Sequence, residues 1–513
     1  QSIIKSKSSD KMLYKTRFPI PILQYLFYLS ELGLHPVYWS VNTFLAPFFV
    51  TTLENHWSID IVLKRVIYVP LLLVFLVIFG IPVVLGCILR CLLHLCKRPY
   101  VLSVDKSFIP PSINERRSSF SVSRNKRNSH QFSKLNLEKI YTVSSANVCL
   151  LPEILSRFNN LPNSAKRSFA IGERIVVDQF FFQNSMNTIM SPPKTWRRNS
   201  KREKNRSAQS PGHNILTHFP RLDFLCLQET WDRNYSHKLM SELHKVFPWI
   251  LYDVGISNYS INRFMFNSGL MFASRYEILD ANFLPFSDSV SQCLYNSKGL
   301  LMAKVLLSST EQHDNVGYIF STHLQAYQGM NTTLQRQLDE ILNWTKLFRQ
   351  ETMKSSDIIL FDVLCGDFNF DNLSPVDVSC TRHEIFNVYE DVCRVKPGQD
   401  QDWTVGTEMR QMCMWEDQVS TPAGLKDALE DPILRHRYLI DANIKEGTMN
   451  EIVTAKPLQE EEVKMNLKEL AGRRRIDYIL YRKDKSLNVQ NYSFITRLST
   501  LTDHIPVTMT FSC

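Results

Sequence analysis

The chain has 513 residues, of which 44% are hydrophobic, and carries a formal net charge of +9. This length accommodates one large domain with an anchor, or two to three average domains. The 11 cysteines are an odd number and show neither a paired disulfide framework nor zinc-ligand spacing, which fits a reducing compartment. The positive charge suits an anionic partner, either nucleic acid or a membrane surface.

Two long apolar segments open the chain, at residues 18–53 and 66–89. The second has no charged residue and is long enough to cross a bilayer as a helix. Because Pro70, Gly80, Pro82 and Gly86 interrupt it, a re-entrant or interfacial hairpin is an alternative, and a buried core helix is another. We predict a membrane-anchoring region within residues 1–100.

Basic residues flank this apolar pair more heavily than they fill its short connection, so the positive-inside rule places the downstream domain in the cytosol. Basic side chains at the membrane edge are expected to attract anionic lipid, and cysteines there are candidates for S-acylation. The two basic residues are Lys97 and Arg98, and the three cysteines are Cys87, Cys91 and Cys96.

Two polar, basic stretches interrupt the rest of the chain. Residues 101–136 are predicted to be a basic, Ser-rich linker, and residues 137–513 a single catalytic domain. A disordered basic insertion is predicted at about residues 185–215, where binding of anionic lipid or nucleic acid is an alternative to a simple solvated segment.

Polar side chains gather where apolar, strand-like runs end. Residues 222–229 predict a buried strand with Glu229 at its tip, and residues 357–369 predict another that ends in Asp367 and Asn369. Side chains two residues apart on an extended chain face the same way. Together this carboxylate and amide can hold a water and a phosphoryl oxygen, although a simple turn explains Gly-Asp-Phe-Asn equally well.

The C-terminal part adds a carboxylate and a histidine. Asp477 lies in an otherwise apolar strand, where a carboxylate requires a partner. His504, in Thr-Asp-His-Ile-Pro, is the natural general base because its ordinary pKa lies near neutrality. Asp477 can orient the second ring nitrogen. The alternative, a purely structural histidine, is the commoner case for an isolated residue.

These motifs, in this order, resemble the DNase I-like endonuclease/exonuclease/phosphatase superfamily. The resemblance implies an α/β fold, a four-layer α/β/β/α sandwich with the site at one rim of its paired sheets. It rests on Asn147 in Ala-Asn-Val-Cys, Glu229 in Leu-Gln-Glu-Thr, His323 in Ser-Thr-His-Leu, Asp367 and Asn369 in Gly-Asp-Phe-Asn, Asp477 in Arg-Ile-Asp-Tyr, and Asp503 with His504 in Thr-Asp-His-Ile-Pro.

Within that superfamily the chain looks closest to the membrane-associated neutral sphingomyelinases, the type 2 enzyme and its near paralogue. The resemblance runs from the apolar pair through Lys97-Arg-Pro-Tyr, Leu251-Tyr-Asp-Val-Gly and Ser297-Lys-Gly to Phe494-Ile-Thr. It implies hydrolysis of sphingomyelin to ceramide and phosphocholine at a membrane, with anionic phospholipids as activators and no nucleic-acid partner. It also implies a Golgi or plasma membrane location, with a mitochondrial or endoplasmic reticulum membrane as the alternative.

The resemblance also implies roles for the matching residues. Glu229 is expected to ligate Mg²⁺, for which Mn²⁺ is a possible substitute, with Asn147 nearby. Asp367 and Asn369 are expected to position the attacking water and the phosphate, and Lys298 to bind substrate. His323 is expected to donate a hydrogen bond to the developing charge. Asp477 is expected to orient His504, and Asp503 to support the side of the site that holds the metal. Cys293 stands where the family pattern has an acidic partner of Lys298, which puts any regulatory pairing in doubt.

Three alternatives follow from the same residues. A nuclease of this fold agrees with the basic stretches but not with the apolar pair. An inositol-polyphosphate phosphatase is disfavoured because Arg-Ile-Asp-Tyr stands where those enzymes have Trp-Cys-Asp-Arg. A catalytically inactive membrane scaffold is disfavoured because all of the expected site residues are present.

Overall fold

The computed structural model describes residues 13–54, 58–105, 107, 139–189, 212–255, 267–326, 332–442, 470–485 and 487–513. The residues outside these ranges include most of the predicted linker, residues 190–211 of the predicted insertion, and residues 1–12. Predictions about them lie outside the described residues.

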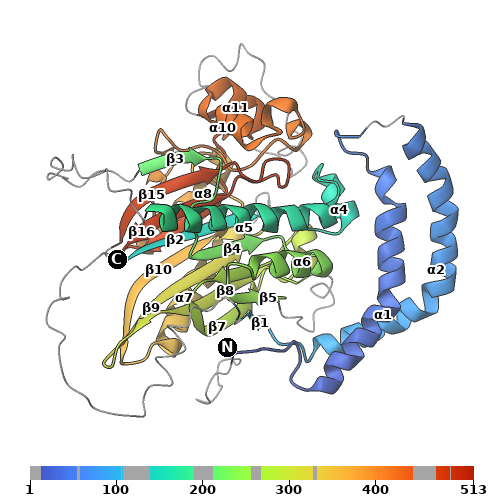
Figure 1. The fold of residues 1–513 in the computed structure, drawn as a ribbon, viewed down its shortest axis with the longest axis horizontal. Coiled ribbons are helices and arrows are strands. Elements are labelled where there is room, and N and C mark those ends of the chain that lie inside the picture. The colour runs from blue at the N-terminus through green and yellow to red at the C-terminus, as the bar shows by residue number, and fades with distance from the viewer. Residues whose placement is uncertain are drawn as a thin grey trace.

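Two mixed sheets form the centre of the molecule (Figure 1). The first has eight strands, in the spatial order β1 (Val101–Val104), β5 (Trp249–Tyr252), β6 (Met271–Ser274), β4 (Phe224–Gln228), β2 (Ile140–Asn147), β16 (Val507–Ser512), β15 (Asn488–Ile495) and β3 (Gly212–Leu216). The second has six, in the order β11 (Tyr389–Asp391), β14 (Asp477–Arg482), β10 (Asp357–Asp367), β9 (Asp314–His323), β8 (Gly299–Ser309) and β7 (Glu277–Pro285). A ribbon of β12 (Arg394–Lys396) and β13 (Gln399–Asp400) pairs with neither sheet.

Alternation of side chains along the strands divides the core into three layers. In β4, Cys226 faces the other sheet and joins a buried cluster that includes Cys365 of β10. Leu225 and Leu227 point the opposite way, into a cluster with two helices, α5 (Ser164–Ile189) and α6 (Arg233–Leu243). A third cluster joins the outer face of the second sheet to α7 (Thr333–Thr352). Helix, sheet, sheet and helix therefore stack in that order, which confirms the predicted four-layer sandwich.

Short helices occupy the connections between these elements. They are α4 (Glu153–Phe158), α8 (Val378–Thr381), α9 (Ile385–Val388), α10 (Pro422–Glu430) and α11 (Pro432–Tyr438), with 3-10 turns η1 (Ala46–Phe48), η4 (Ser291–Tyr295), η5 (Pro375–Asp377), η6 (Gln411–Cys413) and η7 (Asp417–Val419). The ends of the predicted insertion are regular structure, because α5 continues to Ile189 and β3 begins at Gly212. The prediction is therefore wrong for residues 185–189 and 212–215, and the rest of the predicted insertion lies outside the described residues.

The apolar N-terminal region forms a hairpin of two helices, α1 (Pro21–Phe44) and α2 (Ile59–His94), at one edge of the molecule (Figure 1). Their close approach depends on glycine, since a Cβ on Gly33 would lie 2.7 Å from the Pro82 carbonyl oxygen. α2 runs unbroken through Pro70 and Pro82. Among the described residues α2 is the one helix that is long and apolar enough to cross a membrane.

This hairpin rests against the sheet domain at both ends of α1. Before α1, the Arg17 guanidinium pairs with Asp253, and within α1 the Tyr38 hydroxyl donates to Asp232. After α1, the Thr52 N–H donates to Asn160 Oδ1 at 2.8 Å. The connection between the two helices therefore lies on the same side as the sheet domain.

The boundary predicted at residue 100 is wrong in one respect. Val101–Val104 form strand β1, which pairs with β5, and they are not part of a linker. The Leu102 N–H also donates to the Tyr14 carbonyl at 2.7 Å, and Tyr100 is buried in the core between the sheets. Residues on both sides of the hairpin thus complete the sheet domain, because an edge strand needs a partner for its backbone groups.

Candidate active site

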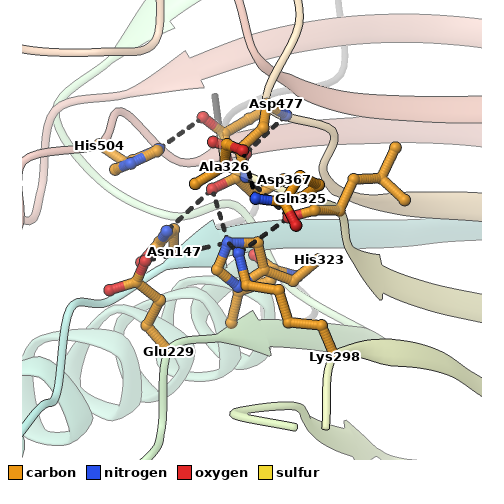
Figure 2. A network of polar contacts seen from close by, with 12 residues as sticks. Asn147, Glu229, Lys298, His323, Gln325, Ala326, Asp367, Asp477 and His504 are labelled. Carbon is orange, nitrogen blue, oxygen red and sulfur yellow. Dashed lines mark hydrogen bonds and ion pairs between the residues drawn. The ribbon is translucent and has the colours of Figure 1, made fainter. Parts of the chain in front are cut away.

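Three adjacent strands of the second sheet end at one rim and bring three predicted residues side by side. In the strand register, Asp367 of β10 lies opposite both His323 of β9 and Asp477 of β14. His323 Nε2 is 3.5 Å from Asp367 Oδ2. All three side chains are almost fully buried. The register thus brings three sequence motifs that lie far apart in the chain into one row (Figure 2).

The first sheet supplies two more residues to the same rim. Asn147 ends β2, and its Nδ2 donates to Asp367 Oδ2 at 3.0 Å across the gap between the sheets. Glu229 follows β4 and lies 3.9 Å from His323 Nε2. The site is therefore built from both sheets, as the rim position predicted.

Backbone strain accompanies this arrangement at two of the predicted residues. Glu229 has φ of +60° and Asn369 has φ of +55°, a left-handed region that costs a residue with a Cβ about 1 kcal/mol or more. Hydrogen bonds hold both conformations: the Leu150 N–H donates to the Glu229 carbonyl at 2.9 Å, and the Asn369 N–H donates to Asp367 Oδ1 at 3.0 Å. Such strain is typical of sites that position reacting groups.

His504 forms a pair with Asp477. Its Nδ1 lies 2.9 Å from Asp477 Oδ2, which leaves Nε2 as the nitrogen that can exchange a proton with substrate or water. Burial alone would lower the pKa of His504, but Asp477, followed by Asp367 and Asp503, raises it well above its usual value. A base must be neutral to act, so its proton has to leave before the reaction.

Lys298 contacts His323 directly, with its Nζ 2.7 Å from His323 Nε2. Burial and the Lys298 charge lower the pKa of His323 well below its usual value, so the ring is neutral and its Nε2 accepts this bond. The expected donation from His323 to substrate therefore requires Lys298 to move. Lys298 also donates to the Leu324 carbonyl at 2.8 Å, which in turn accepts from Asn369 Nδ2 at 3.1 Å. Cys293 is buried in η4.

The residues fit a divalent cation. Glu229, His323 and Asp367 offer ligand atoms that all lie within 4.8 Å of one another, as do Asp367, Asp477 and His504. Burial, followed by the nearby charge of Asp503, raises the pKa of Glu229 to about 7, so a cation bound there would stabilise its charged form. Each group offers two carboxylates and one imidazole and no thiolate, and the carboxylate oxygens, with the nearby amide of Asn147, suit a hard cation such as Mg²⁺.

Asp503 approaches the same cluster from the C-terminal segment. Gln411 Nε2 donates to its Oδ2 at 2.9 Å, while its Oδ1 is buried without a hydrogen-bond partner among the residues that the structure describes. A buried carboxylate oxygen without a hydrogen-bond partner destabilises the folded protein unless a cation or a water molecule binds to it. This orphaned oxygen is a second observation in favour of a bound cation.

Of the predicted membrane-edge residues, Lys97 does not fit its expected role. Its ammonium is buried and bonds to the backbone carbonyls of Asp253 and Gly255, each at 3.0 Å, and it lies 3.4 Å from Asp253 Oδ1. The positive charge of Lys97 is therefore paired with Asp253 inside the protein and is not presented at the surface. Arg98 bonds to Thr16 in an exposed position. The three predicted acylation candidates, Cys87, Cys91 and Cys96, are all exposed.

Some residues of the site carried no recognisable signal in the sequence. Gln411 holds Asp503 from a 3-10 turn far away in the chain. Trp231 stacks on the His323 ring at a centroid distance of 5.6 Å. Its position two residues after Glu229 was the one available hint.

Known proteins resemble this chain along most of its length. No family model matches it. Sphingomyelin phosphodiesterase 5 of Danio rerio is 29% identical over 561 aligned residues, which cover 96% of this chain and 97% of that protein. Sphingomyelin phosphodiesterase 3 of Homo sapiens is 38% identical over 313 residues, which cover 58% of this chain and 46% of that protein. The chain thus spans nearly all of the first relative and about half of the second.

Among solved structures, a beta toxin from Staphylococcus aureus covers 72% of this chain and 99% of its own, with a TM-score of 0.41 and 14% identity. At that level the likeness adds nothing to the sandwich seen directly in the two sheets. The chain is therefore similar along nearly its whole length to a sphingomyelin phosphodiesterase 5, and over 58% of its length to a sphingomyelin phosphodiesterase 3.

Proposed function

We propose that this protein hydrolyses sphingomyelin to ceramide and phosphocholine at a membrane surface. The observation that carries the proposal is the convergence of the His504–Asp477 pair and the Asn147–Asp367 contact at one rim. The near full-length similarity to a sphingomyelin phosphodiesterase 5 supports the choice of substrate.

In this mechanism His504 Nε2 takes a proton from a water molecule while the oxygen of that water attacks the phosphorus of the substrate. Asp477 holds the ring in the required tautomer and stabilises the charged imidazolium that forms. The bond from phosphorus to the ceramide oxygen breaks, and that oxygen takes a proton from a solvent water. The His504 imidazolium then returns its proton to the solvent, which restores the base. Asn369 and Lys298 line the proposed position of the phosphoryl oxygens and stabilise their developing charge, and His323 donates to them once Lys298 has moved from its Nε2.

A divalent cation held by Glu229, with Asn147 nearby, supplies polarisation of a phosphoryl oxygen. Mg²⁺ is the proposed cation, with Mn²⁺ able to replace it, because the ligand atoms are oxygens. Asp503 supports this side of the site through its negative charge.

The cation requirement should depend on pH. Because the pKa of Glu229 is raised to about 7, protons compete with the cation below that pH and are displaced above it. We expect the Mg²⁺ concentration for half-maximal rate to rise as pH falls below about 7, approaching tenfold per pH unit. Mg²⁺ titrations between about pH 6 and pH 8 measure this shift, and a constant half-saturation value across that range would contradict it.

For membrane association, we propose that the α1–α2 hairpin lies at the interface of the cytosolic leaflet. Its interhelical connection contacts the sheet domain, and the outward face of α2 is apolar and exposed. This arrangement agrees better with an interfacial hairpin than with two complete spans. The Golgi or plasma membrane remains the proposed location, and anionic phospholipids the proposed activators.

Binding to anionic membranes should weaken when Arg98 loses its charge. Since a basic residue near an anionic surface contributes about 1 kcal/mol, Arg98→Gln should lower vesicle affinity about fivefold at low salt. The difference should shrink at high salt. Sedimentation with vesicles of phosphatidylserine and phosphatidylcholine measures it, with neutral vesicles as the control. Equal loss of binding to both kinds of vesicle would contradict the electrostatic explanation.

The proposed activity itself is tested with the purified, detergent-solubilised protein. Sphingomyelin, phosphatidylcholine, a lysophospholipid and single-stranded DNA are compared with and without Mg²⁺. Release of phosphocholine from sphingomyelin alone, or far faster than from the other substrates, supports the proposal. Cleavage of DNA without cleavage of sphingomyelin would overturn it.

A further inference from the structure

The outer edge of β14 lacks a strand partner at the position of Asp477. β14 pairs with β10 on one side and with β11 on the other, but β11 ends at Asp391, opposite Leu480. Asp477 lies three residues before Leu480 and therefore beyond the end of β11. The backbone N–H groups of Ile476 and Asp477 need another acceptor there, since both residues are buried.

The hydroxyl of Thr407 is that acceptor. Thr407 Oγ1 accepts from the N–H of Ile476 at 3.0 Å and from the N–H of Asp477 at 3.1 Å. A hydroxyl oxygen has two lone pairs and can accept both bonds at once. Thr407 is completely buried, so no water competes for these donors.

The backbone of the same segment binds the chain that carries the histidine. The Ile505 N–H donates to the Thr407 carbonyl at 2.8 Å, and the Met409 N–H donates to the Asp503 carbonyl at 2.8 Å. Between these bonds, Glu408 forms an antiparallel bridge with His504. The segment from Thr407 to Met409 is thus bonded both to the start of β14 and to the turn that carries His504.

From this geometry we infer that Thr407 is a positioning residue for the reaction, and that its hydroxyl holds Asp477 within hydrogen-bond reach of His504. The inference rests on the proposed role of His504 as the base. The Asp477–His504 contact of 2.9 Å joins two segments that lie apart in the chain, and Thr407 contacts both. Without its oxygen, the start of β14 has to shift toward another acceptor, and a shift of about 1 Å near reacting groups can cost about 100-fold in rate.

The test compares two substitutions that differ in the oxygen. Thr407→Val keeps the shape of the side chain and removes Oγ1, whereas Thr407→Ser keeps Oγ1 and removes the methyl group. We expect Thr407→Val to lower kcat roughly 10- to 100-fold with little change in KM. Thr407→Ser should stay within about threefold of the parent protein. Rates are expressed per folded molecule from thermal melts of the full-length protein.

A double substitution separates positioning from a general loss of structure. In the Asp477→Asn background, Thr407→Val should lower kcat by less than about a further threefold, because both changes disable the same Asp477–His504 pair. A full additional loss in that background, or equal activity of the Val and Ser variants, would overturn the inference. If Thr407→Val does not fold, Thr407→Cys takes its place, since its sulfur is a weak acceptor and predicts an intermediate loss.

The comparison is made on sphingomyelin and on bis(p-nitrophenyl) phosphate. If the parent protein cleaves only the second compound, the proposed lipid substrate fails, and the ratio of the Val and Ser variants still tests Thr407. If the parent protein cleaves sphingomyelin and both variants match it, the inference about Thr407 fails alone.

Discussion

Replacement of His504 by alanine should lower kcat by roughly 10²- to 10⁴-fold, the usual contribution of a general acid–base group. The imidazole is placed for this role by Asp477 at 2.9 Å and by its position at the rim shared with Asp367. Because the backbone of His504 keeps its bridge to Glu408, the folded structure should survive the change. Rate per folded molecule on sphingomyelin measures the effect, and near-normal turnover of folded His504→Ala protein would exclude the base.

Asp477→Asn should also lower the rate, because Asp477 is the hydrogen-bond partner of the proposed base His504. The carboxylate raises the pKa of His504, so its neutralisation should lower that pKa. Since a base works only after it loses its proton, the acid limb of the pH–rate profile should move to lower pH while the maximal rate falls. The loss in the double variant should be close to that of His504→Ala alone, because both substitutions disable one unit. Fully additive losses would mean that the two residues act independently.

Glu229→Gln should produce the other large effect, in the cation requirement. The substitution keeps the size of the side chain and removes the negative charge that the cation needs. Loss of an outer partner of a metal ligand typically costs 10- to 100-fold in metal affinity, so we expect roughly 100-fold or more for this proposed direct ligand. Mg²⁺ titration of the rate measures the shift.

A control for Glu229→Gln is Glu173→Gln on α5, since Glu173 is exposed and belongs to neither group of candidate ligands. That variant should keep the Mg²⁺ dependence of the parent protein. Full activity of the parent protein in excess chelator, or an unchanged titration for Glu229→Gln, would contradict the cation site.

Much of the site could be predicted because its residues follow apolar strands. Strand ends meet at one rim of a sheet, so Asp367 and Glu229 could be placed from local patterns alone. The sandwich was expected only because the motifs together resemble a known superfamily. The register of the strands could not be predicted, since the pairing of Asp367 with both His323 and Asp477 depends on contacts between segments far apart in the chain.

The missed features are those in which a common residue type acquires its role from distant partners. Gln411 and Thr407 have no distinctive neighbours in sequence, and only the folded chain brings them to Asp503 and Asp477. Lys97 was expected at a membrane surface because its local sequence is basic. In the structure the Asp253 segment surrounds it, and a buried lysine of this kind requires such a partner.

The central claim, attack of water on the phosphorus of sphingomyelin, is tested most directly by hydrolysis in water enriched in ¹⁸O. The account predicts that the released phosphocholine gains one ¹⁸O atom from the solvent and that the ceramide gains none, because the broken bond joins phosphorus to the ceramide oxygen. Mass spectrometry of the two products from a Mg²⁺-containing reaction provides the measurement. Label in the ceramide, or no release of phosphocholine by the folded protein, would contradict the account.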